Sequence, residues 1–472
     1  MNNGFNIANY SLKIGSIDII ETQISPLLSD SPENEINIEN ANRKLQEVLK
    51  ETRVRIGTLL KTDNVSFLIG AGASISVGGI SLANIPKKLE FLLISKAGQE
   101  VKTSDSLSWI QLFYSTVTFL CGDIYTYENR QSQYLLEEDK NIQAIPLNLE
   151  DYLSHLYMWL AGIGESGNFI IIKTLDNQEL VIEKGALKQL IKKITSSLTD
   201  LLNLPNNEKD NPLKSHRRFI KKILTRPLNL RRANLFTLNY DTLLEQGADA
   251  EGAVLVDGFV GTLKRVFRPE SYNLDFYFPA QTTEGRVHRF DRALHLYKLH
   301  GSITWHRCAQ SWENPYGIYA TFFNQNCQEE DVLIYPSPLK YGQALGLPYS
   351  ELFRRFGNAV VQPQSVLFTI GYGFGDEHVN ALIRQALAIP SFTIVIIDPD
   401  PKNHFVDELA KLEDERVWII KGWELGAFEH FVQKLMPDLR EEEIEARVIR
   451  TFSKLVNGNS ASNQDEEQNY GE

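Results

Sequence analysis

The chain has 472 residues, a length typical of two or three domains, and its formal net charge of −12 argues against a surface built mainly to bind nucleic acid. Its three cysteines, Cys121, Cys308 and Cys327, form no Cys-x-x-Cys pair, which argues against a disulfide framework and against a cysteine-based zinc site. The sequence shows neither a signal peptide nor an apolar run of about 18 residues, so we expect a cytoplasmic protein without a membrane span.

The first part of the chain predicts a peripheral segment followed by a helix and a strand. Residues 1–35 are polar and patchy, and residues 38–60 have apolar positions at helical spacing. The apolar run Val65–Ile69 predicts a strand that ends in a glycine-rich loop. We therefore expect an N-terminal arm and helix over residues 1–60, ahead of the main domain.

Residues 82–225 have a different pattern, which predicts a mainly helical insert. Two amphipathic helices are indicated over 149–160 and 187–201. Between them, "NFIIIKTLDNQELVIEKG" predicts a β-hairpin that turns at Asp176 and Asn177.

After the insert, the sequence returns to short apolar runs that predict strands. These runs are 233–238, 294–299, 332–335, 365–370, 393–398 and 416–420. Continuous apolar runs are typical of parallel strands buried on both faces by helical crossovers. We predict an α/β, Rossmann-like domain with a mostly parallel sheet over 61–456, interrupted by the insert, and a disordered tail over 457–472.

The glycine-rich loop after the first strand reads Gly70-Ala71-Gly72-Ala73-Ser74. Small residues between a strand and a helix let the backbone approach a pyrophosphate closely. The third glycine of the dinucleotide fingerprint is replaced by Ile75, and no Walker A sequence follows. Taken alone, the loop fits a nucleotide site or a tight structural turn.

Polar residues follow two further predicted strands. Thr237, Asn239 and Asp241 alternate at one strand end, which suits a ligand site at the carboxyl edge of a parallel sheet or a capped helix start. His300 ends the next strand in a His-Gly pair. A histidine there suits a general base, or a structural role bonding a loop carbonyl.

A second glycine-rich loop, "GYGFGDEH", follows the strand at 365–370. Gly371 and Tyr372 begin this loop, and Asp376 is in position to cap a helix. Asp398 ends the next strand, where it is suited to accept hydrogen bonds from ribose hydroxyls or to cap a turn. Two glycine loops, an Asn/Asp pair and a histidine thus all follow strands, which favours one shared site.

Taken together, these motifs resemble the sirtuin superfamily. "GAGAS", "TLNYD" and "KLHGS" are similar to its Gly-Ala-Gly-Ile-Ser loop, its Thr-Gln-Asn-Ile-Asp stretch and its His-Gly catalytic element, and "IGYGFGD" stands where its Gly-Thr-Ser loop would stand. The deacetylases also carry two Cys-x-x-Cys pairs for a zinc ribbon, which this sequence lacks. The stretch "GGISLAN" replaces their Gly-Ile-Pro-Asp-Phe-Arg, so the resemblance does not extend to acyl-lysine recognition.

Several longer runs, among them "VDGFVG", "YKLHGSITW" and "GFGDEHVN", are similar to the sirtuin-like subunit of bacterial antiphage systems that pair with the ATPase HerA. This resemblance implies an NAD⁺ hydrolase that depletes NAD⁺ during infection, with NAD⁺ as its substrate and no metal. It also implies a large homo-oligomer that docks on a HerA-type hexameric ATPase, with nucleic acid contacted at most through that partner.

The resemblance also assigns roles to individual residues. Asn239 would orient water or the ribose, and His300 would act as the base. The implied NAD⁺-binding residues are Gly70, Ala71, Gly72, Ser74, Thr237, Asp241, Gly371, Tyr372 and Asp398. A sirtuin-like module that binds NAD⁺ or ADP-ribose without turnover is the alternative. Protein deacylation and dehydrogenation are disfavoured by the missing cysteine pairs and by Ile75, respectively.

Overall fold

The computed structural model describes residues 7–29, 35–80, 84–99, 108–136, 142–164, 166–173, 179–204, 213–278, 288–321 and 348–441, together with residues 444 and 448. The predicted strand at 332–335, the predicted turn at Asp176 and Asn177, and the predicted disordered tail at 457–472 lie outside these residues. None of the helices described combines the length and apolar character that crossing a bilayer requires.

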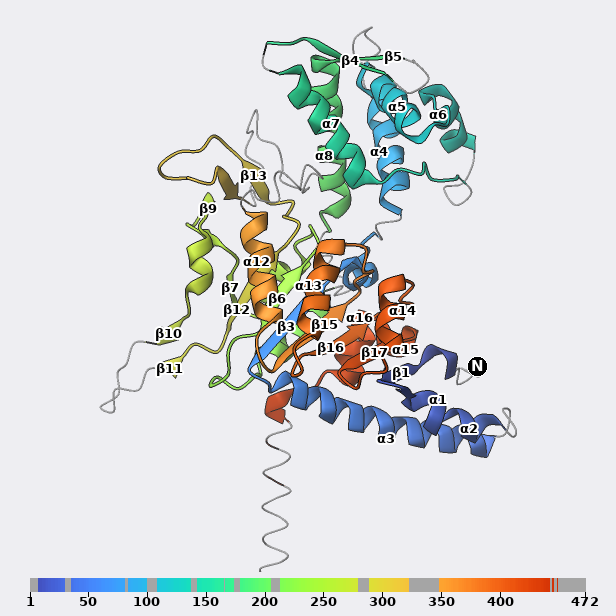
Figure 1. Cartoon of the computed structure of the whole chain (residues 1–472), viewed down its shortest axis with the longest axis vertical. Coiled ribbons are helices and arrows are strands. Elements are labelled where there is room, and N and C mark those ends of the chain that lie inside the picture. Colours follow the sequence, from blue (N-terminus) through green and yellow to red (C-terminus); the bar gives the residue numbers. More distant parts are fainter. Residues whose placement is uncertain are drawn as a thin grey trace, which may run out of the picture.

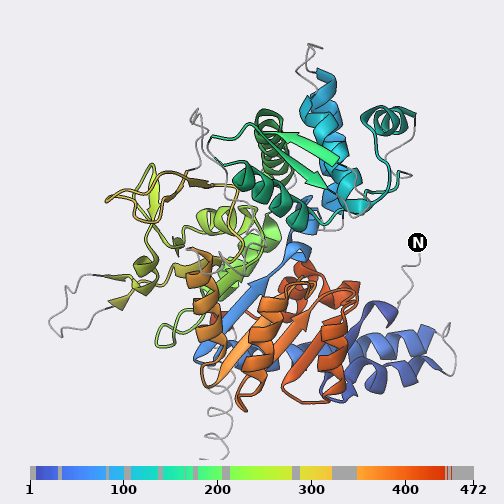
Figure 2. The same cartoon turned by 45° about the horizontal axis from the view of Figure 1, so that its top comes forward.

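The body of the molecule is organised by a nine-stranded sheet in the order β2-β1-β17-β16-β15-β3-β6-β12-β7 (Figures 1 and 2). The strands from β17 to β7 run parallel, and they confirm the predicted α/β, Rossmann-like class. Their bounds are β3 (Asn64–Ile69), β6 (Asn234–Thr237), β7 (Val254–Val256), β12 (Ala293–Lys298), β15 (Ser365–Ile370), β16 (Thr393–Ile397) and β17 (Val417–Lys421).

Both faces of the sheet are covered, as the continuous apolar runs predict. Phe67 of β3 and its partner Phe368 of β15 stack at 5.1 Å on one face, while Leu68 and Leu367 point to the other. The first face packs against α3 (Glu35–Leu60), α9 (Lys214–Ile223), α10 (Leu243–Ala250), α15 (Trp423–Gly426), α16 (Phe428–His430) and η5 (Phe431–Leu435). The second face packs against α12 (Tyr349–Val360), α13 (Glu377–Leu387) and α14 (His404–Lys411).

The N-terminal segment adds antiparallel strands to the sheet, which the sequence analysis does not predict. β1 (Ser11–Ile14) pairs with β17 and with β2 (Ile17–Asp18). The short helices η1 (Ile7–Asn9), α1 (Ile19–Gln23) and α2 (Ser25–Ser29) flank them. Strands of four and two residues are too short to give a clear sequence pattern.

A group of helices with its own apolar core stands apart from the sheet in Figure 1, and we call it the helical lobe. It consists of α4 (Ile85–Gln99), α5 (Ser108–Cys121), α6 (Tyr127–Leu136), α7 (Leu149–Ile163), α8 (Lys184–Leu202) and the hairpin β4 (Phe169–Lys173) and β5 (Glu179–Glu183). Its core also takes in Tyr240 and Ile303 from the body. The lobe therefore packs against the segments that follow β6 and β12.

Two smaller sheets lie near the β7 end of the large sheet (Figure 1). β8 (Phe259–Val260), β9 (Arg265–Phe267), β13 (Trp305–Arg307) and β14 (Ile318–Ala320) form a four-stranded antiparallel sheet. A short helix η4 (Pro269–Asn273) precedes the hairpin of β10 (Tyr277–Phe278) and β11 (His288–Arg289).

The strand order changes direction beside β3. The chain passes from β3 to β6 and β12 on one side, and then to β15, β16 and β17 on the other. In open parallel sheets, a crevice forms at the carboxyl ends of the strands where this reversal occurs. The topology therefore places a ligand crevice between the loops that follow β3 and β15.

Candidate active site

The loops after β3 and β15 cross each other at the reversal point. The backbone N–H of Gly72 donates to the carbonyl oxygen of Gly371 at 2.9 Å, and Gly371 has a φ of 59°. A Cβ on Gly70 would lie 2.5 Å from that oxygen, and a Cβ on Gly72 would lie 2.6 Å from the Cα of Gly371. The glycines are thus required first by the contact between the two loops, which then jointly form one wall of a cavity.

This site cavity has a volume of about 1110 Å³. Its polar half consists of the glycine loops and residues at strand ends, namely Gly70, Ala71, Gly72, Ser74, Asn239, Asp241, His300, Gly371, Tyr372, Asp376 and Asp398. Its apolar half includes Ile85, Ile145, Pro146, Leu149, Leu201 and Leu202 of the helical lobe. The cavity therefore lies between the carboxyl edge of the sheet and the lobe.

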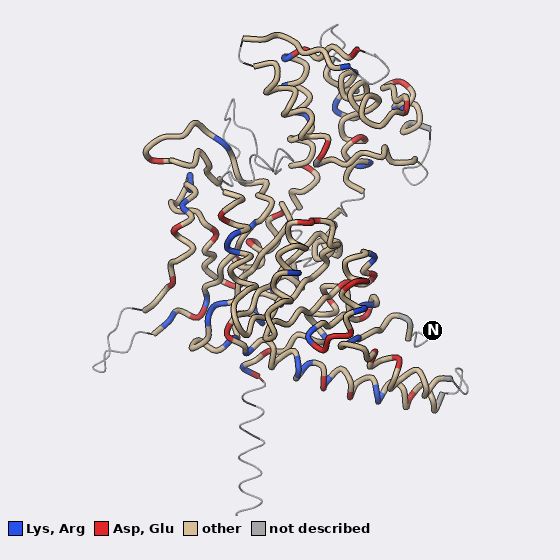
Figure 3. Tube along the Cα trace, in the orientation of Figure 1, with Lys and Arg blue, Asp and Glu red and all other residues tan. Residues whose placement is uncertain are grey.

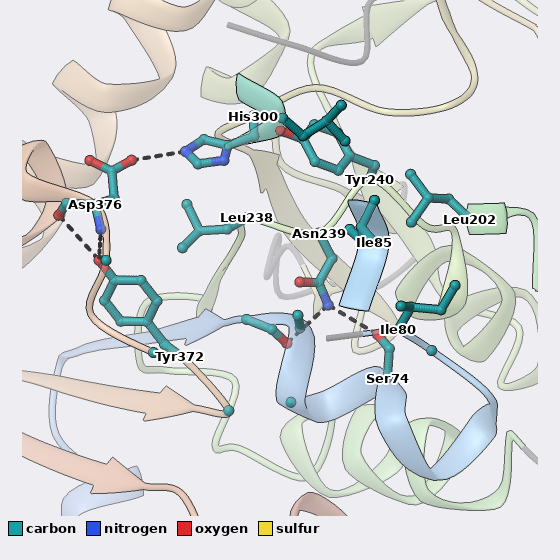
Figure 4. A pocket seen from close by; sticks show the side chains of 18 of the residues that line it. Ser74, Ile80, Ile85, Leu202, Leu238, Asn239, Tyr240, His300, Tyr372 and Asp376 are labelled. Atoms are coloured by element: carbon teal, nitrogen blue, oxygen red, sulfur yellow. Dashed lines mark hydrogen bonds and ion pairs between the residues drawn. The ribbon is translucent and has the colours of Figure 1, made fainter. Parts of the chain in front are cut away.

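The amide of Asn239 is held by a short relay of hydrogen bonds (Figure 4). Its Nδ2 donates to the carbonyl oxygen of Gly70 at 3.0 Å and to Ser74 Oγ at 3.1 Å, and Ser74 Oγ donates to Asp241 Oδ2 at 2.7 Å. These bonds use the nitrogen of the amide, so its carbonyl oxygen is left to accept a hydrogen bond from the cavity. The relay fixes both the position and the orientation of Asn239.

Asp241 is held from two further directions. Its Oδ1 accepts from the backbone N–H of Leu243 at 3.1 Å, at the start of α10, although the N-cap residue of that helix is Thr242 and not Asp241. The ammonium of Lys298 donates to the Asp241 carbonyl oxygen and forms an ion pair of 2.8 Å with Glu245. Asp241 lines the cavity, but its carboxylate serves Ser74 and the backbone.

His300 and Asp376 form a hydrogen-bonded pair, with 2.9 Å between Nε2 and Oδ2 (Figure 4). Their side chains are 9% and 13% exposed, so the pair is largely shielded from water. The other oxygen of Asp376 accepts from the backbone N–H groups of His378 and Val379 at 2.9 and 3.4 Å. Asp376 therefore caps α13, as the sequence suggests, and at the same time holds His300.

Polar contacts also fix the second glycine loop. The hydroxyl of Tyr372 lies 3.2 Å from the carbonyl oxygen of Asp376 and 3.3 Å from Asn380 Oδ1, and burial raises its pKa. Asn380 and Asn403 each donate to the carbonyl oxygen of Phe374, at 2.9 and 3.1 Å. The loop is thus rigidly attached to α13 and α14.

Asp398 follows β16 and lines the cavity as a half-buried residue. Burial raises its pKa, and its Oδ1 accepts from the backbone N–H of Asp400 at 2.9 Å. Its other oxygen is suited to accept from a hydroxyl group.

All but one of the sequence-predicted site residues line the site cavity. The exception is Thr237, whose hydroxyl is buried, donates to Ile69 O at 3.0 Å and accepts from the backbone N–H of Asn239. Thr237 therefore stabilises the loop that carries Asn239 and does not face the cavity. The predicted alternation of Thr237 with Asn239 and Asp241 requires a continuous strand, and β6 ends at Thr237.

The sequence analysis misses two groups of site residues. Asp376 has a local signal as a helix cap, but its contact with His300 spans 76 positions of sequence. The apolar residues of the helical lobe have no motif that relates them to the glycine loops. Among the residues that the structure describes, no group of three or more His, Cys, Asp or Glu is placed to hold a metal ion.

Comparison with known proteins relates the second half of the chain to one family. Residues 233–420 match the family model of the SIR2-like domain, a segment that includes Asn239, His300 and Asp376. No curated protein matches the chain.

Two solved structures resemble the chain loosely. A Sir2 homologue in complex with NAD is 13% identical, with a TM-score of 0.38 over 84% of this chain and 94% of that one. A mutant Sir2 homologue in complex with ADP ribose is also 13% identical, with a TM-score of 0.27 over 78% of this chain and 95% of the other.

Proposed function

We propose that this protein hydrolyses NAD⁺ to nicotinamide and ADP-ribose. The observation that carries the proposal is the meeting of the fixed amide of Asn239 and the His300–Asp376 pair in one cavity beside two interlocked glycine loops. The match of residues 233–420 to the SIR2-like domain supports NAD⁺ as the nucleotide.

The reaction breaks the C–N bond between nicotinamide and the ribose C1′ and forms a C–O bond to water. Nicotinamide leaves as a neutral molecule with the bonding electron pair, so the ribose passes through a state that resembles an oxocarbenium ion. A fixed carbonyl oxygen and a positioned water favour this state more than a strong acid would. The carbonyl oxygen of Asn239 is oriented for such a role, because the amide nitrogen is already bonded.

His300 is suited to take a proton from the attacking water or from a ribose hydroxyl. Its Nε2 is bonded to Asp376, so Nδ1 is the nitrogen available for that proton. The backbone N–H groups of Gly70 and Gly72 already donate to the carbonyl oxygens of Ile370 and Gly371. We therefore assign the pyrophosphate to the surface of the loop at Gly70, Ala71 and Gly72, where small residues permit close approach. We assign the ribose and adenine end to Gly371, Tyr372 and Asp398. These contacts hold ground and transition states alike and should mainly affect KM.

The test is turnover of NAD⁺ by the purified chain, with free nicotinamide and ADP-ribose quantified separately. Asn239→Ala and His300→Ala should fold and lose kcat by roughly 10²-fold or more, because each removes a group that acts on the reacting atoms. Wild-type turnover in either variant would overturn the assignment. Binding of NAD⁺ without nicotinamide release by the wild-type chain would favour the alternative of a sensor module.

We further propose that the chain acts in antiviral defence in the cytoplasm, as a homo-oligomer with a HerA-type ATPase. This part rests on the resemblance of runs such as "YKLHGSITW" and "GFGDEHVN". Native mass measurement of the chain, alone and mixed with the ATPase, tests the assembly. Equal NAD⁺ hydrolysis with and without the ATPase would contradict control by that partner.

A further inference from the structure

A second concave site lies on the face of α9 that points away from the large sheet, and we call it the basic hollow. It is lined by Lys214, Arg217, Arg218, Lys221 and Lys222 of α9, with Arg53, Glu251, Gln433, Asp438 and Glu441 around them, and has a volume of about 560 Å³. It shares no lining residue with the site cavity. Its basic character stands out in a chain whose net charge is −12.

The amphipathic pattern of α9 places its cations on one side. Phe219, Ile220 and Ile223 are buried against the first face of the sheet, and the cations recur at helical spacing on the opposite side. From Lys214 to Lys221 the row is about 10 Å long, at about 1.5 Å per residue. Helices α3 and η5 pack against each other and η5 packs against α9, which brings Arg53 and Gln433 to the row. Figure 3 shows charges of both signs along α3, whereas basic residues outnumber acidic ones by six to three among the residues that line the hollow.

Among the described residues, the cations of the hollow differ in how they are partnered. Arg217 pairs with Glu251 at 3.0 Å, and Lys222 donates to the carbonyl oxygens of Val432 and Met436. By contrast, Lys214, Arg218 and Lys221 make no hydrogen bond or ion pair within the described part of the chain.

Burial and the neighbouring positive charges act together on Lys222. Burial, followed by the neighbouring charges of Arg53 and Arg218, lowers the pKa of Lys222 to about 8. Like charges held close together destabilise the fold unless an opposite charge joins them. An anion in the basic hollow would relieve this repulsion.

We propose that the basic hollow binds a compact oligophosphate, that is, two or three linked phosphates, either free or carried by a nucleoside. Arginine matches phosphate oxygens with two parallel N–H donors, and lysines add point charges along the row. A single phosphate would engage only part of the row. An extended nucleic-acid backbone would continue past the row of cations along a chain whose net charge is −12, so a compact ligand is favoured.

The experiment is calorimetric titration of the full chain with sodium tripolyphosphate at low salt. We expect saturable binding to one site per chain, and a Kd at least tenfold weaker in Arg218→Glu/Lys221→Glu. The matched control is Lys188→Glu/Lys192→Glu, which makes the same charge change on exposed residues of α8 and should bind as the wild type does. An equal loss in both double variants, or no binding by the wild type, would overturn the proposal.

Additional titrants identify the ligand, and an activity assay checks the fold. Inorganic phosphate should bind at least tenfold more weakly than tripolyphosphate, and ATP should lose affinity in Arg218→Glu/Lys221→Glu. A 20-nucleotide single strand that binds while tripolyphosphate does not would overturn the compact ligand. Arg218 and Lys221 lie outside the site cavity, so the double variant should keep wild-type NAD⁺ turnover. If the wild-type chain does not hydrolyse NAD⁺ at all, circular dichroism checks folding and the binding test is unaffected.

Discussion

At the scale of single residues, Asp376 uses its two carboxylate oxygens for different partners. Oδ1 caps α13 through the N–H groups of His378 and Val379, and Oδ2 meets His300 Nε2 at 2.9 Å. An ionised carboxylate only accepts hydrogen bonds, so this contact places the proton of the neutral imidazole on Nε2. The lone pair then lies on Nδ1. Asp376 is thus a positioning residue, because it selects which histidine nitrogen is basic.

The tautomer argument predicts the behaviour of Asp376→Asn. Asparagine keeps the helix cap, but its amide can donate to Nε2 and favour the other tautomer. We expect kcat to fall on the order of 10²-fold with little change in KM. Nitrogen NMR of labelled His300 would show the proton moved to Nδ1.

The control for this prediction is Asn403→Ala, which loosens the same loop without touching His300. It should lower the melting temperature and leave the His300 tautomer unchanged. Wild-type kcat in Asp376→Asn, or an unchanged NMR signature, would refute a positioning role for Asp376.

At the scale of elements, the two glycine loops depend on each other. A Cβ on Gly72 would lie 2.6 Å from the Cα of Gly371, and neither backbone can move without breaking the hydrogen bond between them. Overpacking of this kind costs about 1–3 kcal/mol. We therefore expect Gly72→Ala to lower the free energy of unfolding by about that amount and to raise KM for NAD⁺, as measured by denaturant titration and steady-state kinetics.

Gly373 provides the matched control, since it lies in the second loop without a positive φ, and a Cβ added there would meet nothing within 4 Å beyond its chain neighbours. Gly373→Ala should leave the stability unchanged within about 0.5 kcal/mol. Equal destabilisation by both substitutions would show that the loop crossing has no special role.

The sequence predicts six of the nine strands of the large sheet and the polar residues that follow them, because these signals are local, whereas it misses the short strands β1, β2 and β7. Continuous apolar runs mark β3, β6, β12, β15, β16 and β17, and each motif follows its strand directly. The crossing of Gly72 with Gly371 and the pair of His300 with Asp376 join distant segments, so no local pattern contains them. Thr237 shows that a local pattern can also mislead. Its predicted alternation with Asn239 requires the strand to continue, and β6 ends at Thr237.

At the scale of the whole molecule, the site cavity depends on both the sheet and the helical lobe. The sheet provides the glycine loops, Asn239 and His300, and the lobe provides an apolar wall that includes Ile145, Leu149 and Leu202. Tyr240, next to Asn239, is buried in the core of the lobe. The sequence predicts a helical insert, but the apolar positions of the insert suit an ordinary helix core, so no local pattern singles out the residues that line the site cavity.

This arrangement predicts that NAD⁺ orders both parts of the molecule. In His300→Ala, which should bind NAD⁺ without consuming it, amide hydrogen exchange should slow at 70–74 and 371–376. If the lobe wall belongs to the site, exchange should also slow at 144–149 and 201–204, because binding stabilises the closed form of the segments that line the cavity. The hairpin of β4 and β5 shares no residue with the cavity and is the internal control. Protection restricted to 70–74 and 371–376 would mean that NAD⁺ is held by the sheet alone and that the lobe acts elsewhere.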